Sequence, residues 1–177
     1  MHPLVRSTLV EIERATAGMT ADDWQRHPDG KWSAAEVLEH LSITFGSTAK
    51  GLQKVLDAGR HPSAKRSAAQ FFRKLVVIDI GYFPSGRKAP TFTVPTGISG
   101  EEALRRVRDY LPAMDQAISE CERRFGSKII GPHPVIGPLT AEQWRRFHLI
   151  HTRHHMKQIA RLRAERAVAA TPAASAK

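Results

Sequence analysis

Apolar residues recur every three or four positions in four long segments of the chain, with polar residues between them. This spacing is typical of amphipathic α-helices, because about 3.6 residues make one turn. The pattern predicts helices from 3 to 17, from 33 to about 59, from 99 to about 126 and from 140 to about 166. No apolar and polar alternation is long enough to predict a β-sheet.

Three of these helices begin with a sequence that can form a capping box. In such a box a Ser or Thr side chain accepts a hydrogen bond from the backbone three residues later, where Glu or Gln returns one. Pro112 lies inside the third helix, and it removes one backbone hydrogen bond, so we expect a kink or break near 109–111. The predicted boxes pair Ser33 with Glu36, Ser99 with Glu102 and Thr140 with Gln143.

Together the four helices predict an all-α fold, a four-helix bundle with a long crossover between its second and third helices. The crossover runs from His61 to Ile98, and we expect one short helix within it. A connection of this length suits helices that need not be antiparallel neighbours. We expect a single domain over 1–166 and a disordered tail over 167–177.

Composition agrees with one soluble domain. The chain has 177 residues, of which 41% are hydrophobic, and its apolar runs are far too short to span a membrane. The N-terminus lacks the apolar stretch of a secretory signal, so we expect a cytoplasmic protein. The single cysteine, Cys121, lies in a predicted helix, which indicates a buried and unreactive thiol.

The formal net charge of +10 raises the question of an anionic partner. Basic residues occur in every region and are interleaved with acidic ones over 101–124. No dense basic run with stacking aromatics appears, so we expect no nucleic-acid partner. Because no apolar run can span a bilayer, we also expect no membrane partner. We interpret the charge as solvated helix faces that attract an anionic small molecule.

The fourth helix contains several histidines, and two of them have the spacing of metal ligands. His151 and His155 lie roughly 40° apart around a helix and one turn apart along it, so both imidazoles can reach one ion. Phe147 and other apolar side chains project to the same side, which places this pair on the buried stripe. His154 points roughly 100° away from His155, toward the rim, and is left out of the ligand set. His148 lies on nearly the azimuth of His151 and stays open as an alternate or supporting ligand.

Two histidines make an incomplete site, so a third ligand must come from another element. His40 is the best placed, since it lies at the border of the apolar stripe of the second helix. A lone buried histidine is usually just hydrogen-bonded to a carbonyl, but a facing pair with a third core histidine favours a divalent metal site. The remaining candidates sit beside prolines or near a terminus: His2, His27, His61 and His133.

The second and fourth helices also resemble a known family. The stretch GKWSAAEVLEHL over 30–41, followed about a hundred residues later by HxxHHxxQ over 151–158, is similar to the DinB-like superfamily of four-helix metalloproteins. The stretch 133–140, followed by Trp144, resembles a branch known only as a domain of unknown function. The resemblance covers most of the chain, from Trp32 to Leu162.

This resemblance implies a divalent metal on His40, His151 and His155. Known members of the superfamily include thiol-dependent transferases and a maleylpyruvate isomerase that use mycothiol, bacillithiol or glutathione, and members are often dimers. The resemblance therefore implies a homodimer with a small-molecule substrate or a low-molecular-weight thiol as its partners. The superfamily name refers to a damage-inducible gene and implies no DNA binding.

Three neutral imidazoles leave positive charge and at least one open position on a divalent ion, as in catalytic sites. Zinc is the first expectation, and nickel, iron and manganese are alternatives. The leading hypothesis is a transferase or isomerase in which the metal holds the thiolate of a small cofactor. A metal-dependent hydrolase and a non-enzymatic metal-binding stress protein are the alternatives.

Other polar residues near the histidines have two interpretations each. Gln158 can orient a ligand or water, or it can form a bond within its own helix. Capping and solvation account for Glu36 and Glu39, so no carboxylate indicates a general base. Three arginines of the fourth helix could meet cofactor carboxylates, but solvated surface positions explain them better, so none is assigned a site role: Arg145, Arg146 and Arg153.

Overall fold

The computed structural model describes residues 1–84, 86 and 88–169, and these are mostly helical, as the all-α prediction requires. Two 3-residue strands form the one sheet among the described residues. The elements are α1 (Pro3–Thr16), α2 (Ala21–Gln25), α3 (Ala34–Asp57), α4 (Ala68–Lys74), η1 (Leu75–Asp79), η2 (Thr91–Thr93), α5 (Gly100–Phe125), β1 (Gly131–His133), β2 (Gly137–Leu139) and α6 (Ala141–Ala169).

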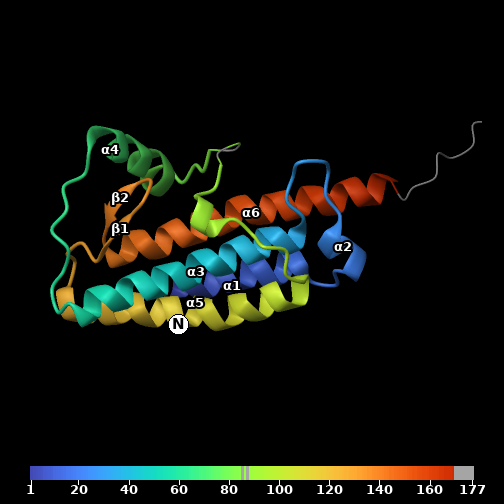
Figure 1. Cartoon of the computed structure of the whole chain (residues 1–177). Helices are drawn as coiled ribbons and strands as arrows, with labels where there is room; N and C mark the ends of the chain where they lie inside the picture. The colour runs from blue at the N-terminus through green and yellow to red at the C-terminus, as the bar shows by residue number, and fades with distance from the viewer. Residues whose placement is uncertain (85, 87, 170–177) are drawn as a thin grey trace, which may run out of the picture.

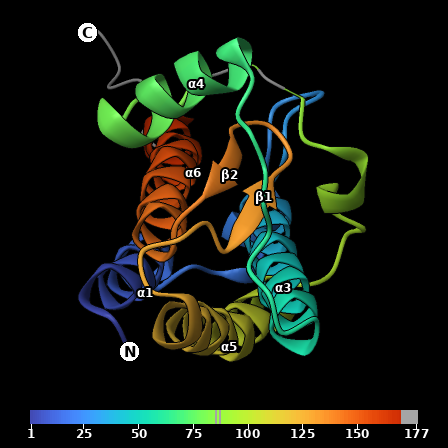
Figure 2. The same cartoon turned by 90° about the vertical axis from the view of Figure 1, so that its left-hand side faces the viewer.

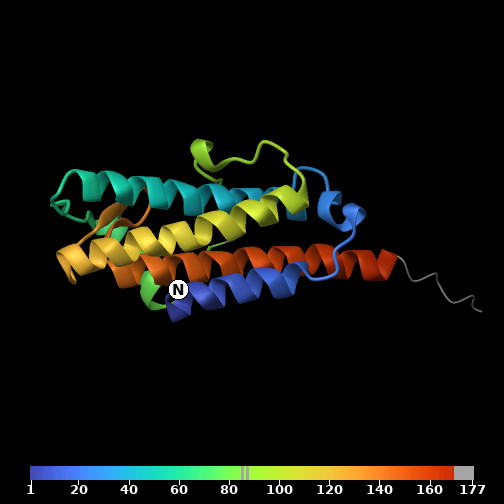
Figure 3. The ribbon, with the colours of Figure 1, turned by 90° about the horizontal axis from the view of Figure 1, so that it is seen from below.

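The four long helices α1, α3, α5 and α6 lie side by side (Figures 1 and 3). Helices α3 and α5 run in the same direction, since Cys121 Sγ lies 3.9 Å from the Leu52 carbonyl and Arg124 donates to the Leu56 carbonyl at 2.9 Å. A chain can join two parallel helices only by returning along their whole length. The long crossover over 58–99 makes this return, and it contains α4, as expected.

Helices α1 and α6 form a second parallel pair. Arg153 of α6 contacts Glu11 of α1 at 3.1 Å, and Arg163 donates to the carbonyl of Ala15 at 2.8 Å. Figure 2 shows the four helices nearly end on, with α4 and the β1–β2 hairpin lying across one side of them. The side chains between the four helices form the apolar core.

The capping boxes at α3 and α6 are present, whereas the one predicted at α5 is only half formed. Ser99 Oγ accepts from the Glu102 backbone N–H at 3.2 Å, but the Glu102 carboxylate pairs with Arg105 and Arg106 instead of returning a bond. Two nearby guanidinium groups outcompete a single backbone donor for this carboxylate. Boxes that we did not predict begin α2, at Thr20, and α4, at Ser67.

Helix α5 runs through Pro112 without a break, so of the expected kink or break near 109–111 the break is wrong. Pro112 is exposed, and so is Arg108, whose carbonyl loses its partner when proline lacks an N–H. Water can hydrate that carbonyl, which keeps the helix continuous at low cost.

The hairpin between α5 and α6 was also not predicted. Its strands pair Gly131 with Leu139 and His133 with Gly137, in antiparallel register. Strands this short, each with glycine and proline, show no alternating pattern. Gly137 adopts a φ of +81° against Gln70 of α4, so this turn requires glycine.

Helix α6 continues to Ala169, beyond its predicted end near Arg166. The rest of the predicted tail, 170–177, lies outside the described residues. No helix within the described part of the chain is long and apolar enough to cross a membrane.

Packing between α2 and α5 provides a test of the fold. A Cβ atom added to Gly100 would lie 2.1 Å from Cδ2 of the buried Trp24 ring, so we expect Gly100→Ala to lower the free energy of unfolding by about 1–3 kcal/mol. Gly51→Ala is the matched control, because a Cβ there meets open space within α3, and it should raise stability by about 0.5–1 kcal/mol. Urea unfolding measures the free energy of unfolding of both variants. Equal changes in Gly100→Ala and Gly51→Ala would contradict the close packing of Trp24 on Gly100.

Candidate metal centre

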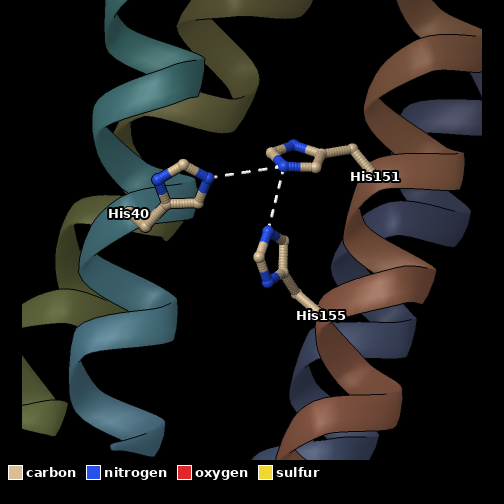
Figure 4. A group of neighbouring side chains, drawn as sticks. All are labelled: His40, His151 and His155. Carbon is tan, nitrogen blue, oxygen red and sulfur yellow. Dashed lines mark hydrogen bonds between the residues drawn. The ribbon is translucent and has the colours of Figure 1, made fainter. Parts of the chain in front are cut away.

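Three imidazole rings meet between α3 and α6 (Figure 4). His151 Nε2 lies 3.3 Å from His40 Nε2 and 2.9 Å from His155 Nε2. All three side chains are buried, with 4–6% of their surface exposed. The residues singled out from the sequence therefore lie together, and this group could hold a metal ion.

The helix geometry explains why the rings meet. His151 and His155 are one turn apart on α6 and project toward α3 (Figure 4). His148 lies one turn earlier and contacts Thr48 of α3 at 3.2 Å, so α3 runs antiparallel to α6. In that register His40 of α3 lies opposite the His151 and His155 pair.

Hydrogen bonds outside the cluster determine the tautomers of two of the rings. His40 Nδ1 lies 2.8 Å from the Thr93 carbonyl and His155 Nδ1 lies 2.8 Å from Gln158 Oε1, and both oxygens can only accept. Each Nδ1 therefore carries the proton, and each neutral ring directs the lone pair of Nε2 toward the centre. Such outer hydrogen bonds are typical of metal-binding histidines.

Burial keeps the three rings neutral. It lowers the pKa of His40 and moves that of His151 well below its ordinary value. Burial, together with the neighbouring His40, lowers the pKa of His155 to about 3. At neutral pH the cluster therefore presents unprotonated nitrogens, the form that binds metals.

The three candidate ligand nitrogens lie within 4.8 Å of one another, and two of their separations are close to those around one ion. Two nitrogens at about 2.0–2.1 Å from a tetrahedral zinc are about 3.3 Å apart, close to the separations of 3.3 and 2.9 Å found here. Protein hydrogen bonds alone satisfy this arrangement poorly, because His151 Nε2 has one proton at most and two lone pairs face it. The buried His151 Nδ1 has no hydrogen-bond partner among the described residues.

His148 and His154 lie outside the cluster. The His148 ring stacks on Trp144 and its Nε2 lies 3.2 Å from Thr48 Oγ1, so it packs beside the site without joining it. His154 accepts a hydrogen bond from the Gln158 amide at 3.3 Å, and its ring lies against Phe83. Gln158 thus connects His154 to His155 within α6. The other four histidines are elsewhere: His2, His27, His61 and His133.

Glu39 is the supporting residue that the sequence analysis missed. It is 1% exposed, and the expectation that it is solvated is wrong. Its carboxylate accepts hydrogen bonds from the Thr96 hydroxyl at 2.6 Å and from the backbone N–H groups of Thr96, Gly97 and Ile98. Burial opposes its ionisation, but these hydrogen bonds outweigh burial and lower the pKa of the Glu39 carboxyl.

Glu39 and His40 are adjacent on α3, and both bind the end of the crossover. His40 is hydrogen-bonded to the Thr93 carbonyl, and the Glu39 carboxylate accepts hydrogen bonds from residues 96–98. These contacts attach the segment to α3 beside the cluster. No spacing rule could identify Glu39, because its partners are more than fifty residues away.

Aromatic rings surround the cluster, and the cluster lies at the wall of a groove. Trp32 packs on His40 with ring centroids 5.1 Å apart, and Phe83 and Phe147 pack on His151 at 5.0 and 5.3 Å. All of these side chains line one groove that also reaches the hairpin. Apolar walls exclude water and strengthen electrostatic interactions at the site.

Of the three arginines of α6, Arg145 differs from the expectation of a solvated position, whereas Arg146 and Arg153 are exposed, as expected. Arg145 is 2% exposed and pairs with Glu122 at 2.7 Å and with Asp115 at 3.7 Å, so it joins α6 to α5. Arg153 pairs with Glu11 of α1. Arg146 is exposed and lines the groove.

Cys121 is buried, as expected. Burial raises the pKa of its thiol to about 11, which keeps it protonated and unreactive at neutral pH.

The fold and these distances define a class: a helical protein in which buried histidines from two antiparallel helices could hold a metal ion. The chain belongs to the DinB superfamily, whose family model matches residues 5–159. The resemblance found in the sequence is thereby confirmed. Comparison with curated proteins finds no match, and neither does comparison with solved structures.

Glu39 can be tested by removing its charge. Glu39→Gln places an amide N–H₂ against backbone donors, and we expect it to lower the free energy of unfolding by about 2–3 kcal/mol at pH 7. Because folding lowers the pKa of this carboxyl, its contribution is complete above the unfolded-state pKa of about 4.3 and disappears as pH falls through the folded pKa. Urea unfolding at neutral pH and at about pH 3 should therefore show a difference that shrinks with acid. Glu101→Gln, at an exposed site, is the control, and an equal loss there would refute the role of Glu39.

Proposed function

We propose that His40, His151 and His155 bind one divalent metal ion in a DinB-like four-helix bundle. The observation that supports this most is a pair of outer contacts, from His40 Nδ1 to the Thr93 carbonyl and from His155 Nδ1 to Gln158 Oε1. Donation from each Nδ1 to its oxygen leaves both Nε2 lone pairs facing His151. Zinc suits three imidazoles best, with nickel, iron and manganese as alternatives. We further propose that the protein acts in the cytoplasm as a homodimer.

We propose that the site serves a thiol-dependent transferase or isomerase. A bound ion with three neutral ligands would keep positive charge and an open position, which favours the thiolate form of a low-molecular-weight thiol at neutral pH. The chain's own residues supply the surroundings, because Trp32, Phe83 and Phe147 form apolar walls beside the cluster. Arg146 in the same groove would attract the carboxylates of such a thiol or substrate. No side chain is assigned as a catalytic residue.

A metal-dependent hydrolase and a non-enzymatic metal-binding stress protein are the weaker candidates. Hydrolysis by a metal-bound water commonly uses a carboxylate as general base. Glu39, the acidic neighbour of His40, already accepts four hydrogen bonds from the crossover. The cluster itself consists only of histidines. A stress protein that merely binds metal would show metal stoichiometry without turnover.

The metal site is tested by single substitutions in untagged protein. We expect about one ion per chain in wild type and a loss of stoichiometric metal in His40→Ala, His151→Ala and His155→Ala, measured by elemental analysis. His148→Ala and His154→Ala are matched controls from the same helix and should keep their metal, because neither ring belongs to the cluster. Circular dichroism checks that each variant is folded. Equal metal content in all five variants would show that the ligand set is misplaced.

The reaction is tested with cobalt-substituted protein. Glutathione, bacillithiol or mycothiol should change the visible spectrum of cobalt by supplying a sulfur ligand, and one of them should support turnover with a panel of electrophiles. His154→Ala should respond like wild type, whereas His155→Ala should not. Full cobalt loading with neither a spectral change nor turnover would exclude the thiol reaction and leave the metal site standing.

A further inference from the structure

The crossover concentrates positive charge. Over 58–99 the sequence has seven basic residues and one acidic residue, a net +6 of the +10 of the whole chain. The interpretation of the excess charge as solvated faces of the long helices therefore does not cover this segment. Its acidic residue, Asp79, is neutralised by Lys74 at 2.8 Å. Among the cations of this segment that the structure describes, four are exposed: Arg60, Lys65, Arg73 and Lys88.

The same segment exposes large apolar side chains. Phe71, Phe72, Ile80 and Tyr82, here called the crossover patch, are each 53–68% exposed. Scattered apolar residues are normal on a surface, but four within twelve positions form a concentration that usually marks an interaction site. The Phe71 and Phe72 rings contact each other with centroids 6.0 Å apart, so at least this pair is continuous.

The fold leaves this patch on the outside of the molecule. Val77 and Ile78 form the inner side of the segment and are buried, and the segment packs on α6 and β2. Helix α4 lies across the outside of the long helices, with no other described element beyond it (Figures 1 and 2). Packing on α6 and β2 thus buries the inner apolar residues of the crossover, whereas the crossover patch stays exposed.

We propose that the crossover patch docks the protein on an anionic lipid surface. Phe71, Phe72, Ile80 and Tyr82 would enter the boundary between headgroups and acyl chains. The exposed cations beside them would lie at the level of the negatively charged headgroups. Such docking needs no spanning helix, and the sequence argument against a membrane concerned a spanning segment. The proposal does not depend on the metal.

Charge decides between a lipid surface and a second copy of the chain. In a two-fold dimer the same patch faces itself, which would place two segments of net +6 against each other. An anionic surface instead attracts both the cations and the apolar side chains. The aliphatic Ile80 also favours lipid over nucleic acid, since base stacking requires aromatic rings.

The test uses sedimentation of the full-length, metal-loaded protein with vesicles. Wild type should bind vesicles of equal parts phosphatidylglycerol and phosphatidylcholine and should not bind phosphatidylcholine alone. Phe71→Ser/Phe72→Ser should lower partitioning by about tenfold or more, because two large apolar groups no longer enter the lipid. Val10→Ser is the matched control, since Val10 is 57% exposed on α1, and it should bind like wild type.

A second pair of variants separates local from overall charge. Arg73→Glu should weaken binding several-fold, whereas Arg123→Glu, which changes the net charge equally at an exposed position on α5, should not. Light scattering and a titration with single-stranded RNA complete the test. The proposal is overturned if wild type ignores anionic vesicles, or if Val10→Ser loses as much binding as the double variant. It is also overturned if the double variant dissociates a dimer, or if the patch binds RNA more tightly than vesicles.

Discussion

Three neutral imidazoles, almost fully buried, share one small space between α3 and α6. Their facing nitrogens cannot all satisfy one another with hydrogen bonds, because His151 has at most one proton to place between two lone pairs. A cation placed among them would remove this conflict. The surrounding structure maintains this arrangement, since Thr93 and Gln158 accept the Nδ1 protons of His40 and His155 and leave no proton on either Nε2.

The crossover follows from the direction of the helices. Because α3 and α5 are parallel, the chain must return past the whole length of the pair, and it does so over the groove above the cluster. Glu39 and His40 then attach the end of this return to α3. One segment therefore contributes the carbonyl that orients a candidate ligand and, on its outer side, an exposed apolar and basic surface.

Regular periodicity made the long helices predictable, and the cap residues placed the starts of three of them within a residue or two. The errors share a cause: side-chain contacts and solvent exposure, which a local sequence pattern does not show, changed the outcome. The Glu102 carboxylate pairs with two arginines and does not complete the capping box. Pro112 is tolerated because it lies on the solvent-exposed side of α5. Arg145 looks like any surface arginine until Asp115 and Glu122 of α5 are placed beside it.

Three features could be predicted from residue spacing along one helix or from a local motif: the all-α class, the superfamily and the pairing of His151 with His155. The sequence also favoured His40, from its place at the border of an apolar stripe and from the family resemblance. Tertiary structure alone brought His40 within 3.3 Å of His151 and buried Glu39 against 96–98. Contacts between residues fifty to a hundred positions apart depend on the relative direction of the helices, which no local pattern specifies.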